Sequence, residues 1–97
     1  MSYKEVNLID NQKENAYELW IEEKRSFIDY KIEGGSSLLL HTEVPEELEG
    51  QGIGSSLVEK TFSYLQEENL KVVPICSFVK TYLQTHPEWN HLVANSK

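Results

Sequence analysis

Three glycines at alternating positions separate a strand-like run from an amphipathic, helix-like run in the middle of this chain. Gly50, Gly52 and Gly54 lie within the segment Glu43–Val58, after Pro45 and directly before apolar residues at helical spacing. Glycine adopts positive φ and lets another group approach the backbone closely. The free N–H groups at a helix start, together with the helix dipole, form a site for phosphate. The turn therefore predicts a strand, a phosphate-binding loop and a helix in direct succession.

The turn does not match the two best-known phosphate-binding motifs. It is not a Walker loop, because no Gly-Lys-Ser/Thr follows it. It is a poor dinucleotide fingerprint, because it follows antiparallel strand patterns instead of opening the chain. Glycines at a strand-to-helix connection also occur where they only form the turn and bind no ligand. On the residues of the turn alone, both readings stay open.

The residues before the turn favour an antiparallel meander of three or four strands. The strand-like runs are 15–22, 27–33 and 38–44, with 6–9 as a short and ambiguous fourth. In the run 27–33, Ile28, Tyr30 and Ile32 alternate with polar residues and so share one face. Lys24-Arg25 is expected at one hairpin tip, and Gly34–Ser37 is a strong turn signal before the last strand.

The residues after the turn change to helical spacing. The pattern predicts a helix from about Gly52 to Glu68, ended by Asn69, and then a short buried strand over 71–75. Ser77 is expected to cap a second helix, which has Phe78, Val79, Tyr82 and Leu83 on its apolar face and stops at Pro87. A helix between two strands predicts a right-handed crossover. The strands that end at Val44 and Ile75 should therefore run parallel, without pairing along their whole length. The predicted class is α+β, a meander followed by a β-α-β-α unit around a mixed sheet.

Length and charge limit the possible partners. The 97 residues are expected to form one domain, 1–97, with no apolar run long enough for a membrane span and no secretory signal. The net charge of −7 disfavours nucleic acid and anionic membrane surfaces, which need a basic face. Cys76 is the only cysteine, which suits a cytoplasmic setting, and His86 and His91 show no metal-binding spacing, so no metal is expected. The expected oligomeric state is a monomer or a weak homodimer.

Three segments together resemble one enzyme superfamily. They are His41-Thr-Glu-Val-Pro45, Gly50-Gln-Gly-Ile-Gly54 and Val73–Val79, and the last continues to His86-Pro-Glu-Trp89. In this combination they look like the GNAT superfamily of N-acetyltransferases, and in particular its very short stand-alone members. The resemblance covers roughly residues 3 to 90. It implies a three-layer α/β GNAT-like arrangement with a splayed cleft, and acetyl-CoA as the co-substrate.

The resemblance also implies roles for the turn. The backbone of Val44 would hydrogen-bond the pantetheine arm of CoA, and the amides of Gly50, Gln51, Gly52, Ile53 and Gly54 would hold the pyrophosphate. One position departs from the family pattern. The first loop residue, usually Gln or Arg, is Glu49 here. A carboxylate about 8 Å from a phosphate costs only ~0.5–2 kcal/mol, so the loop is still expected to bind.

Cys76 is the second candidate site residue. It precedes the expected second helix, and a helix N-terminus directed at a thiol lowers the pKa of that thiol. The alternative is a small buried apolar residue, as most free cysteines are. The resemblance implies a function for Cys76, either as an acyl-accepting nucleophile or as a cofactor contact beside Ser77. Many larger family members have Asn in the position of Cys76 and use it to contact the cofactor.

His41 and Glu43 are two residues apart on one predicted strand, so their side chains share a face. That spacing places a base and a carboxylate together, where they could deprotonate an acceptor amine. They are also consistent with ordinary polar residues at an open sheet end. Many family members use a tyrosine on the second helix as the acid for the leaving thiolate. Leu83 occupies that position here, and the neighbouring Tyr82 would project away from it.

The leading prediction is transfer of an acetyl group from acetyl-CoA to an amine acceptor, which is a small molecule, a polyamine or a protein. The transfer proceeds by direct attack or through Cys76, with direct attack ranked first as the family's usual route. The alternative is a non-catalytic module that binds or senses acyl-CoA.

Overall fold

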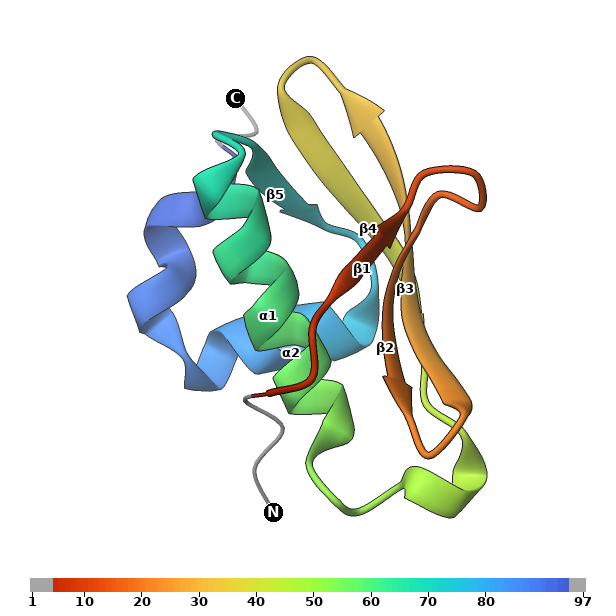
Figure 1. The fold of residues 1–97 in the computed structure, drawn as a ribbon. Coiled ribbons are helices and arrows are strands. Elements are labelled where there is room, and N and C mark those ends of the chain that lie inside the picture. Colours follow the sequence, from red (N-terminus) through yellow and green to blue (C-terminus); the bar gives the residue numbers. More distant parts are fainter. Residues whose placement is uncertain (1–4, 95–97) are drawn as a thin grey trace.

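Within the described residues, 5–94, the computed structural model forms one mixed sheet of five strands in the order β1-β2-β3-β4-β5. The strands are β1 (Ile9–Asn11), β2 (Ala16–Ile21), β3 (Lys24–Glu33), β4 (Ser36–Glu43) and β5 (Lys71–Pro74). The helices are α1 (Ile53–Glu67) and α2 (Ser77–Thr85), with the short 3-10 helices η1 (Glu46–Leu48) and η2 (Pro87–Leu92). Figure 1 shows α1 and α2 together on one side of the sheet.

The first four strands pair as the predicted antiparallel meander. The β2–β3 turn consists of Glu22 and Glu23, both at positive φ (53° and 65°). The prediction of a hairpin tip at Lys24-Arg25 was wrong by two residues, because both already belong to β3. No glycine marks this turn, and two glutamates adopt the left-handed backbone that the turn requires.

Strands β4 and β5 pair in parallel over only four residues and then separate. The pairing runs from Ser36 opposite Lys71 to Leu39 opposite Pro74. Past that point, the N–H groups of Ile75 and Cys76 both donate to the Leu39 carbonyl, at 3.1 and 2.8 Å. Strand β4 continues to Glu43, while the segment after β5 turns away into α2. The predicted parallel crossover and the incomplete pairing are both confirmed.

A β-bulge at Leu40 decides which way the end of β4 faces. Tyr30 of β3 pairs with Leu39, but Asp29 pairs with His41, so Leu40 is the extra residue. The bulge shifts the side-chain alternation by one position. As a result Thr42 lies opposite the buried Ile28 and faces the helices, whereas His41 turns to the other face.

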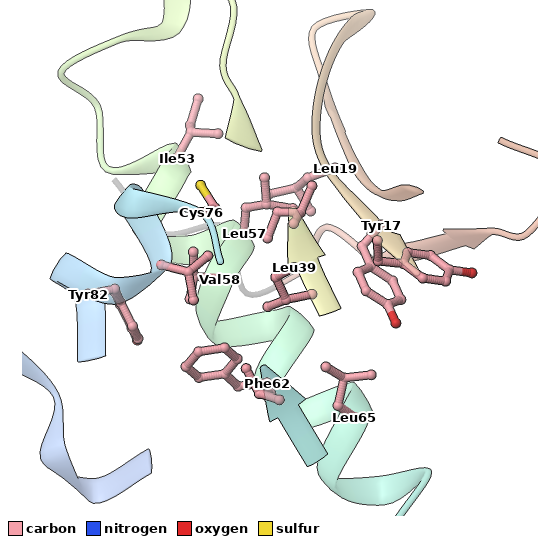
Figure 2. Close-up of a cluster of buried hydrophobic side chains, with 14 of the residues drawn as sticks. Tyr17, Leu19, Leu39, Ile53, Leu57, Val58, Phe62, Leu65, Cys76 and Tyr82 are labelled. Carbon is pink, nitrogen blue, oxygen red and sulfur yellow. The ribbon is translucent and has the colours of Figure 1, made fainter. Parts of the chain in front are cut away.

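The core lies between the sheet and α1. Leu57, Phe62 and Leu65 of α1 are fully buried against Leu19 and Leu39 of the sheet, as Figure 2 shows. Apolar residues at helical spacing form one face of α1, and their burial stabilises it more than helix propensity does. The helix lies within one residue of each predicted end and is followed by Asn69 at positive φ (61°). The N–H of Asn69 donates to Gln66 and that of Leu70 to Leu65, which is a Schellman motif.

The start of α2 differs from the prediction. Its N-cap is Cys76, not Ser77. Val79 and Tyr82 are buried as expected, but Phe78 is 41% exposed because it points toward the glycine turn instead of the core.

The predicted α+β class with a mixed sheet is confirmed. The layers are simpler than in a three-layer sandwich. Phe62 of α1 and Tyr82 of α2 are in ring contact at 5.7 Å, so both helices pack on the same face of the sheet. In residues 5–94, no helix combines the length and the apolar character needed to cross a bilayer.

Candidate functional site

A cavity of about 420 Å³ lies where β4 extends beyond β5. Its wall comes from the end of β4, the loop after it, the start of α1 and one side chain of α2. The lining residues are Thr42, Glu43, Val44, Leu48, Glu49, Gly50, Gly52, Ile53, Gly54, Ser55 and Phe78. Segments on both sides of the strand separation therefore meet in one cavity.

The floor of the cavity is the glycine turn. Gly50 and Gly52 have φ of 81° and 79°, and Gly52 is the N-cap of α1. The first helical hydrogen bond runs from Ser56 N–H to the Gly52 carbonyl, at 3.1 Å. The N–H groups of Ile53, Gly54 and Ser55 precede that bond and have no intrahelical acceptor. Among the described residues, no side chain caps them, so they remain donors for a ligand.

Gly54 is required for a different reason, since its φ is ordinary. A Cβ atom there would lie 2.6 Å from Cζ of Phe78. The ring of Phe78 thus packs directly on the backbone of α1 and forms the apolar wall of the cavity. Alternation patterns gave no sign of this contact, because Phe78 fits the apolar spacing of α2.

The charges around the cavity are negative. Glu43 and Glu49 both line it, and none of its lining residues is basic. Gln51 does not line it, and its side-chain amide donates to the Glu47 carbonyl at 3.4 Å. For an anionic ligand, the backbone amides would have to outweigh these carboxylates.

Cys76 lies behind the wall of the cavity. Its side chain is 9% exposed and is hydrogen-bonded to Thr42 Oγ1 at 3.2 Å. Burial alone raises the pKa of the thiol, but the Thr42 hydroxyl and the N–H groups of Val79 and Phe78 outweigh it, so the pKa lies below its ordinary value. Alternation along β4 was a signal that could have placed Thr42 on the face opposite to His41 and Glu43.

His41 and Glu43 form a close pair on the face of β4 opposite to Thr42 and Cys76. His41 Nε2 lies 2.6 Å from Glu43 Oε1, and both side chains are more than half exposed. An ionised carboxylate only accepts hydrogen bonds, so Nε2 donates and Nδ1 of a neutral ring keeps its lone pair. The ring of Phe27 meets that of His41 edge to face at 6.5 Å.

Tyr82 is directed away from the cavity. Its ring stacks on His86 at 3.9 Å and is buried, which raises the pKa of its hydroxyl. Within residues 5–94, no cluster of three His, Cys, Asp or Glu side chains is arranged to hold a metal ion.

Comparison with known proteins identifies the architecture. Residues 16–92 match the family model described as GCN5-related N-acetyltransferase. The chain belongs to this family.

Individual relatives agree with this family assignment. Protein NATD1 of Xenopus tropicalis is 31% identical over 64 residues, which are 65% of this chain and 59% of that relative. Protein NATD1 of Homo sapiens is 35% identical over 49 residues, 50% of this chain and 43% of that protein. The chain thus spans about half the length of these curated relatives. The solution NMR structure of a GCN5-like protein from Staphylococcus aureus superposes with a TM-score of 0.70, at 25% identity, over 95% of this chain and 91% of the other.

The residues predicted for the site occupy three places in this family member. Glu43, Val44, Gly50, Gly52, Ile53 and Gly54 line the cavity. Cys76 contacts a lining residue without lining the cavity itself, and His41 reaches it only through Glu43. Gln51 and Ser77 are exposed and lie outside the lining.

Proposed function

We propose that this chain binds acetyl-CoA in the cavity at the strand separation and transfers the acetyl group to an amine acceptor. The observation that carries the proposal is the meeting of two features in one cavity. The N–H groups of Ile53, Gly54 and Ser55, which have no intrahelical acceptor, lie in the cavity together with the part of β4 beyond its pairing with β5. Donors at a helix start suit a pyrophosphate, and a strand edge suits the amides of a pantetheine arm.

His41, on the face of the sheet opposite the helices, supplies a base. The amine nitrogen attacks the thioester carbonyl carbon, the C–S bond breaks and the CoA thiolate leaves. The proton lost by the amine passes to Nδ1 of His41, directly or through water, while Glu43 holds the ring through Nε2. No tyrosine takes the position of an acid, because Leu83 stands there and Tyr82 is stacked on His86. The thiolate therefore takes its proton from water.

Cys76 offers a second route, through an acetylated thiol. Its lowered pKa favours the thiolate. However, its burial behind Thr42 separates it from the cavity lining. Direct attack therefore remains the preferred route.

A second candidate function is an acyl-CoA sensor that does not turn over. The absence of a tyrosine at position 83 favours it, because the leaving thiolate then lacks a protein acid. Both functions require the same cavity and differ only in chemistry.

One pair of variants tests the cavity. Gly52→Asp and Gly35→Asp impose the same backbone strain, because φ is 79° and 81° and an added Cβ meets nothing within 4 Å at either glycine. Only Gly52 lies in the cavity. Acetyl-CoA at 100 times Kd should stabilise the wild type and Gly35→Asp by about 2.7 kcal/mol, whereas Gly52→Asp should lose most of this response. Equal responses from both variants would refute the proposed binding site.

Turnover separates the two functions. Free CoA and protein mass are followed after incubation with acetyl-CoA, with and without an amine. CoA release only with amine supports direct transfer. An acetyl adduct that disappears in Cys76→Ser supports the covalent route. Binding without either product supports the sensor.

A further inference from the structure

The face of the sheet opposite the helices, called here the open face, is lined along three neighbouring strands by aromatic and charged side chains. Strand register places one set of residues on this face. They are Glu18 and Trp20 of β2, Arg25, Phe27 and Asp29 of β3, and His41 and Glu43 of β4. Phe27 is the cross-strand partner of both Glu18 and Glu43, so its ring lies between two carboxylates.

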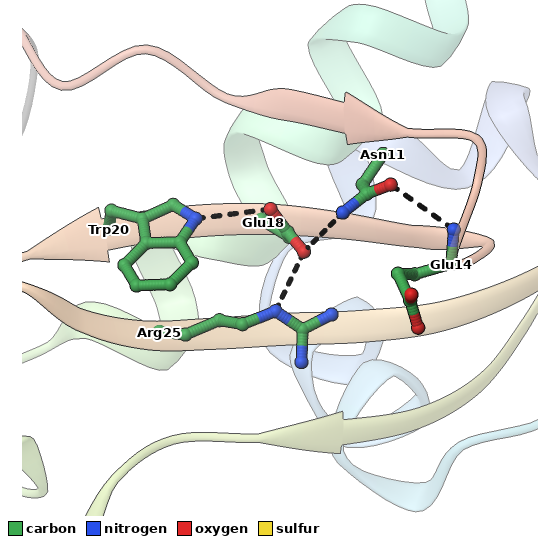
Figure 3. A network of polar contacts seen from close by, with 5 residues as sticks. All are labelled: Asn11, Glu14, Glu18, Trp20 and Arg25. Atoms are coloured by element: carbon green, nitrogen blue, oxygen red, sulfur yellow. Dashed lines mark hydrogen bonds and ion pairs between the residues drawn. The ribbon is translucent and has the colours of Figure 1, made fainter.

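One of these carboxylates already holds a cation. Glu18 accepts hydrogen bonds from Arg25 Nε at 2.7 Å, Asn11 at 2.9 Å and Trp20 at 3.1 Å, as Figure 3 shows. Burial acts to raise the pKa of Glu18, but these bonds outweigh it and hold the pKa below its ordinary value. The Arg25 guanidinium also lies over the Phe27 ring, 4.1 Å from its centre. The open face thus binds an organic cation from the protein's own chain.

The next carboxylate on this face has no such partner. Asp29 is the cross-strand neighbour of His41, and in the part of the chain that the structure describes it forms no ion pair. Glu43 is paired only with His41 among these residues. Cβ atoms of cross-strand neighbours lie about 4.5–5.5 Å apart. Asp29 is therefore one side chain away from the His41–Glu43 pair, on the side away from the cavity.

We infer that Asp29 determines specificity for an acceptor with two cationic centres, namely a short aliphatic diamine or polyamine. The inference rests on the proposed function. The reacting nitrogen must be uncharged when it attacks, so it gains little from a carboxylate at that moment. A second ammonium group stays protonated and pairs with Asp29, while the methylene chain spans the distance from Asp29 to the reacting nitrogen beside His41. An aliphatic monoamine lacks the group that Asp29 would hold.

The experiment compares putrescine, a diamine, with butylamine, a monoamine of similar length. Binding to the CoA-loaded protein is followed by NMR, and KM and kcat are measured for both amines. Asp29→Asn should weaken putrescine binding about two- to fivefold, the range of an exposed ion pair. Its effect on butylamine, on kcat and on the KM for acetyl-CoA should be negligible, and Asp29→Glu should restore putrescine binding.

Glu33→Gln is the matched control. Glu33 lies on the same strand and face and is paired with Lys31 at 3.1 Å, so the variant removes one negative charge away from the proposed contact. It should leave the preference for putrescine unchanged. An equal loss in Glu33→Gln would show that overall charge, and not Asp29, sets the preference. That result would overturn the inference.

The shift pattern gives a second decision. Putrescine should perturb Phe27, Asp29 and His41. A different cavity, of about 400 Å³, lies on the helix side, where Tyr30 and Tyr64 donate to Asp10 at 2.6 Å each. Shifts confined to that cavity would overturn the inference. A protein that ignores CoA but still discriminates putrescine through Asp29 would refute the proposed function and retain the amine site.

Discussion

At the scale of single residues, the contact between Gly54 and Phe78 couples the loop to the second helix. An alanine at position 54 would place its Cβ 2.6 Å from the ring. The ring, which is 41% exposed, would have to move, and this disturbs its packing on α1 and the apolar wall of the cavity. Gly54→Ala should therefore lower stability and weaken CoA binding.

The same substitution should have the opposite effect on stability when the ring is absent. Alanine is favoured over glycine in a helix by about 0.5–1 kcal/mol. In a Phe78→Ala background, Gly54→Ala should therefore stabilise the protein. Denaturant unfolding of the four proteins completes a double-mutant cycle. A destabilisation that is the same in both backgrounds would show that Phe78 is not the obstacle.

Thr42 contributes to the lowered pKa of Cys76, because its hydroxyl is hydrogen-bonded to the sulfur. Thr42→Val should raise the pKa of the thiol and move the pH profile of iodoacetamide alkylation to higher pH. Thr61→Val is the control, since Thr61 is buried and its hydroxyl has no partner among the described residues. An unchanged profile in Thr42→Val would remove the proposed role of that hydrogen bond.

The lowered pKa of Cys76 also predicts a pH-dependent stability. The native thiol ionises at lower pH than the unfolded one, so the unfolded state binds more protons between the two pKa values. Stability should therefore rise with pH across this interval, up to about pH 8.5. Cys76→Ser should lack this rise, measured as free energy of unfolding against pH.

At the scale of elements, the β2–β3 turn stores avoidable strain. Glu22 and Glu23 both have positive φ, and a left-handed backbone costs a non-glycine residue about 1–2 kcal/mol. Replacing the pair by Asn-Gly should stabilise the protein by about 1 kcal/mol and raise Tm by about 4–8 °C. Asn-Gly in place of Lys24-Arg25, two residues later in β3, should not stabilise the protein. An unchanged Tm for the turn variant would mean that the strain is relieved by other means.

At the scale of the whole molecule, the negative net charge lowers the affinity for CoA, whereas the N–H donors at the start of α1 raise it. The chain carries −7, and CoA is a polyanion. Raising the ionic strength from about 0.01 M to about 0.15 M shortens the Debye length from ~30 to ~8 Å. CoA affinity should therefore increase with salt, whereas putrescine affinity should decrease. Calorimetry at both ionic strengths measures this, and Glu49→Gln should reduce the salt effect on CoA.

Much of the overall architecture could be predicted from the sequence. Glycine placement located the loop, helical spacing located α1 within one residue of each end, and the crossover rule fixed β4 and β5 as parallel. These features depend on local conformational preferences, which the sequence carries directly.

The arrangement of the site could be predicted only in part. Side-chain alternation showed that His41 and Glu43 share a face, but not which face, because the bulge at Leu40 has no glycine or proline to mark it. Phe78 was expected in the core because apolar spacing does not distinguish packing on a helix from packing on a glycine backbone. Both outcomes depend on tertiary contacts between distant segments.

The carbonyl of Leu39 accepts hydrogen bonds from two N–H groups at the point where β4 and β5 separate. These two hydrogen bonds fix the point beyond which β4 and the segment after β5 diverge. The two segments therefore already diverge before a ligand arrives, and in residues 5–94 the β4–β5 ladder does not extend beyond Leu39, where the ligand would bind. We expect association with CoA to be a single fast phase whose rate scales linearly with CoA concentration in stopped-flow measurements.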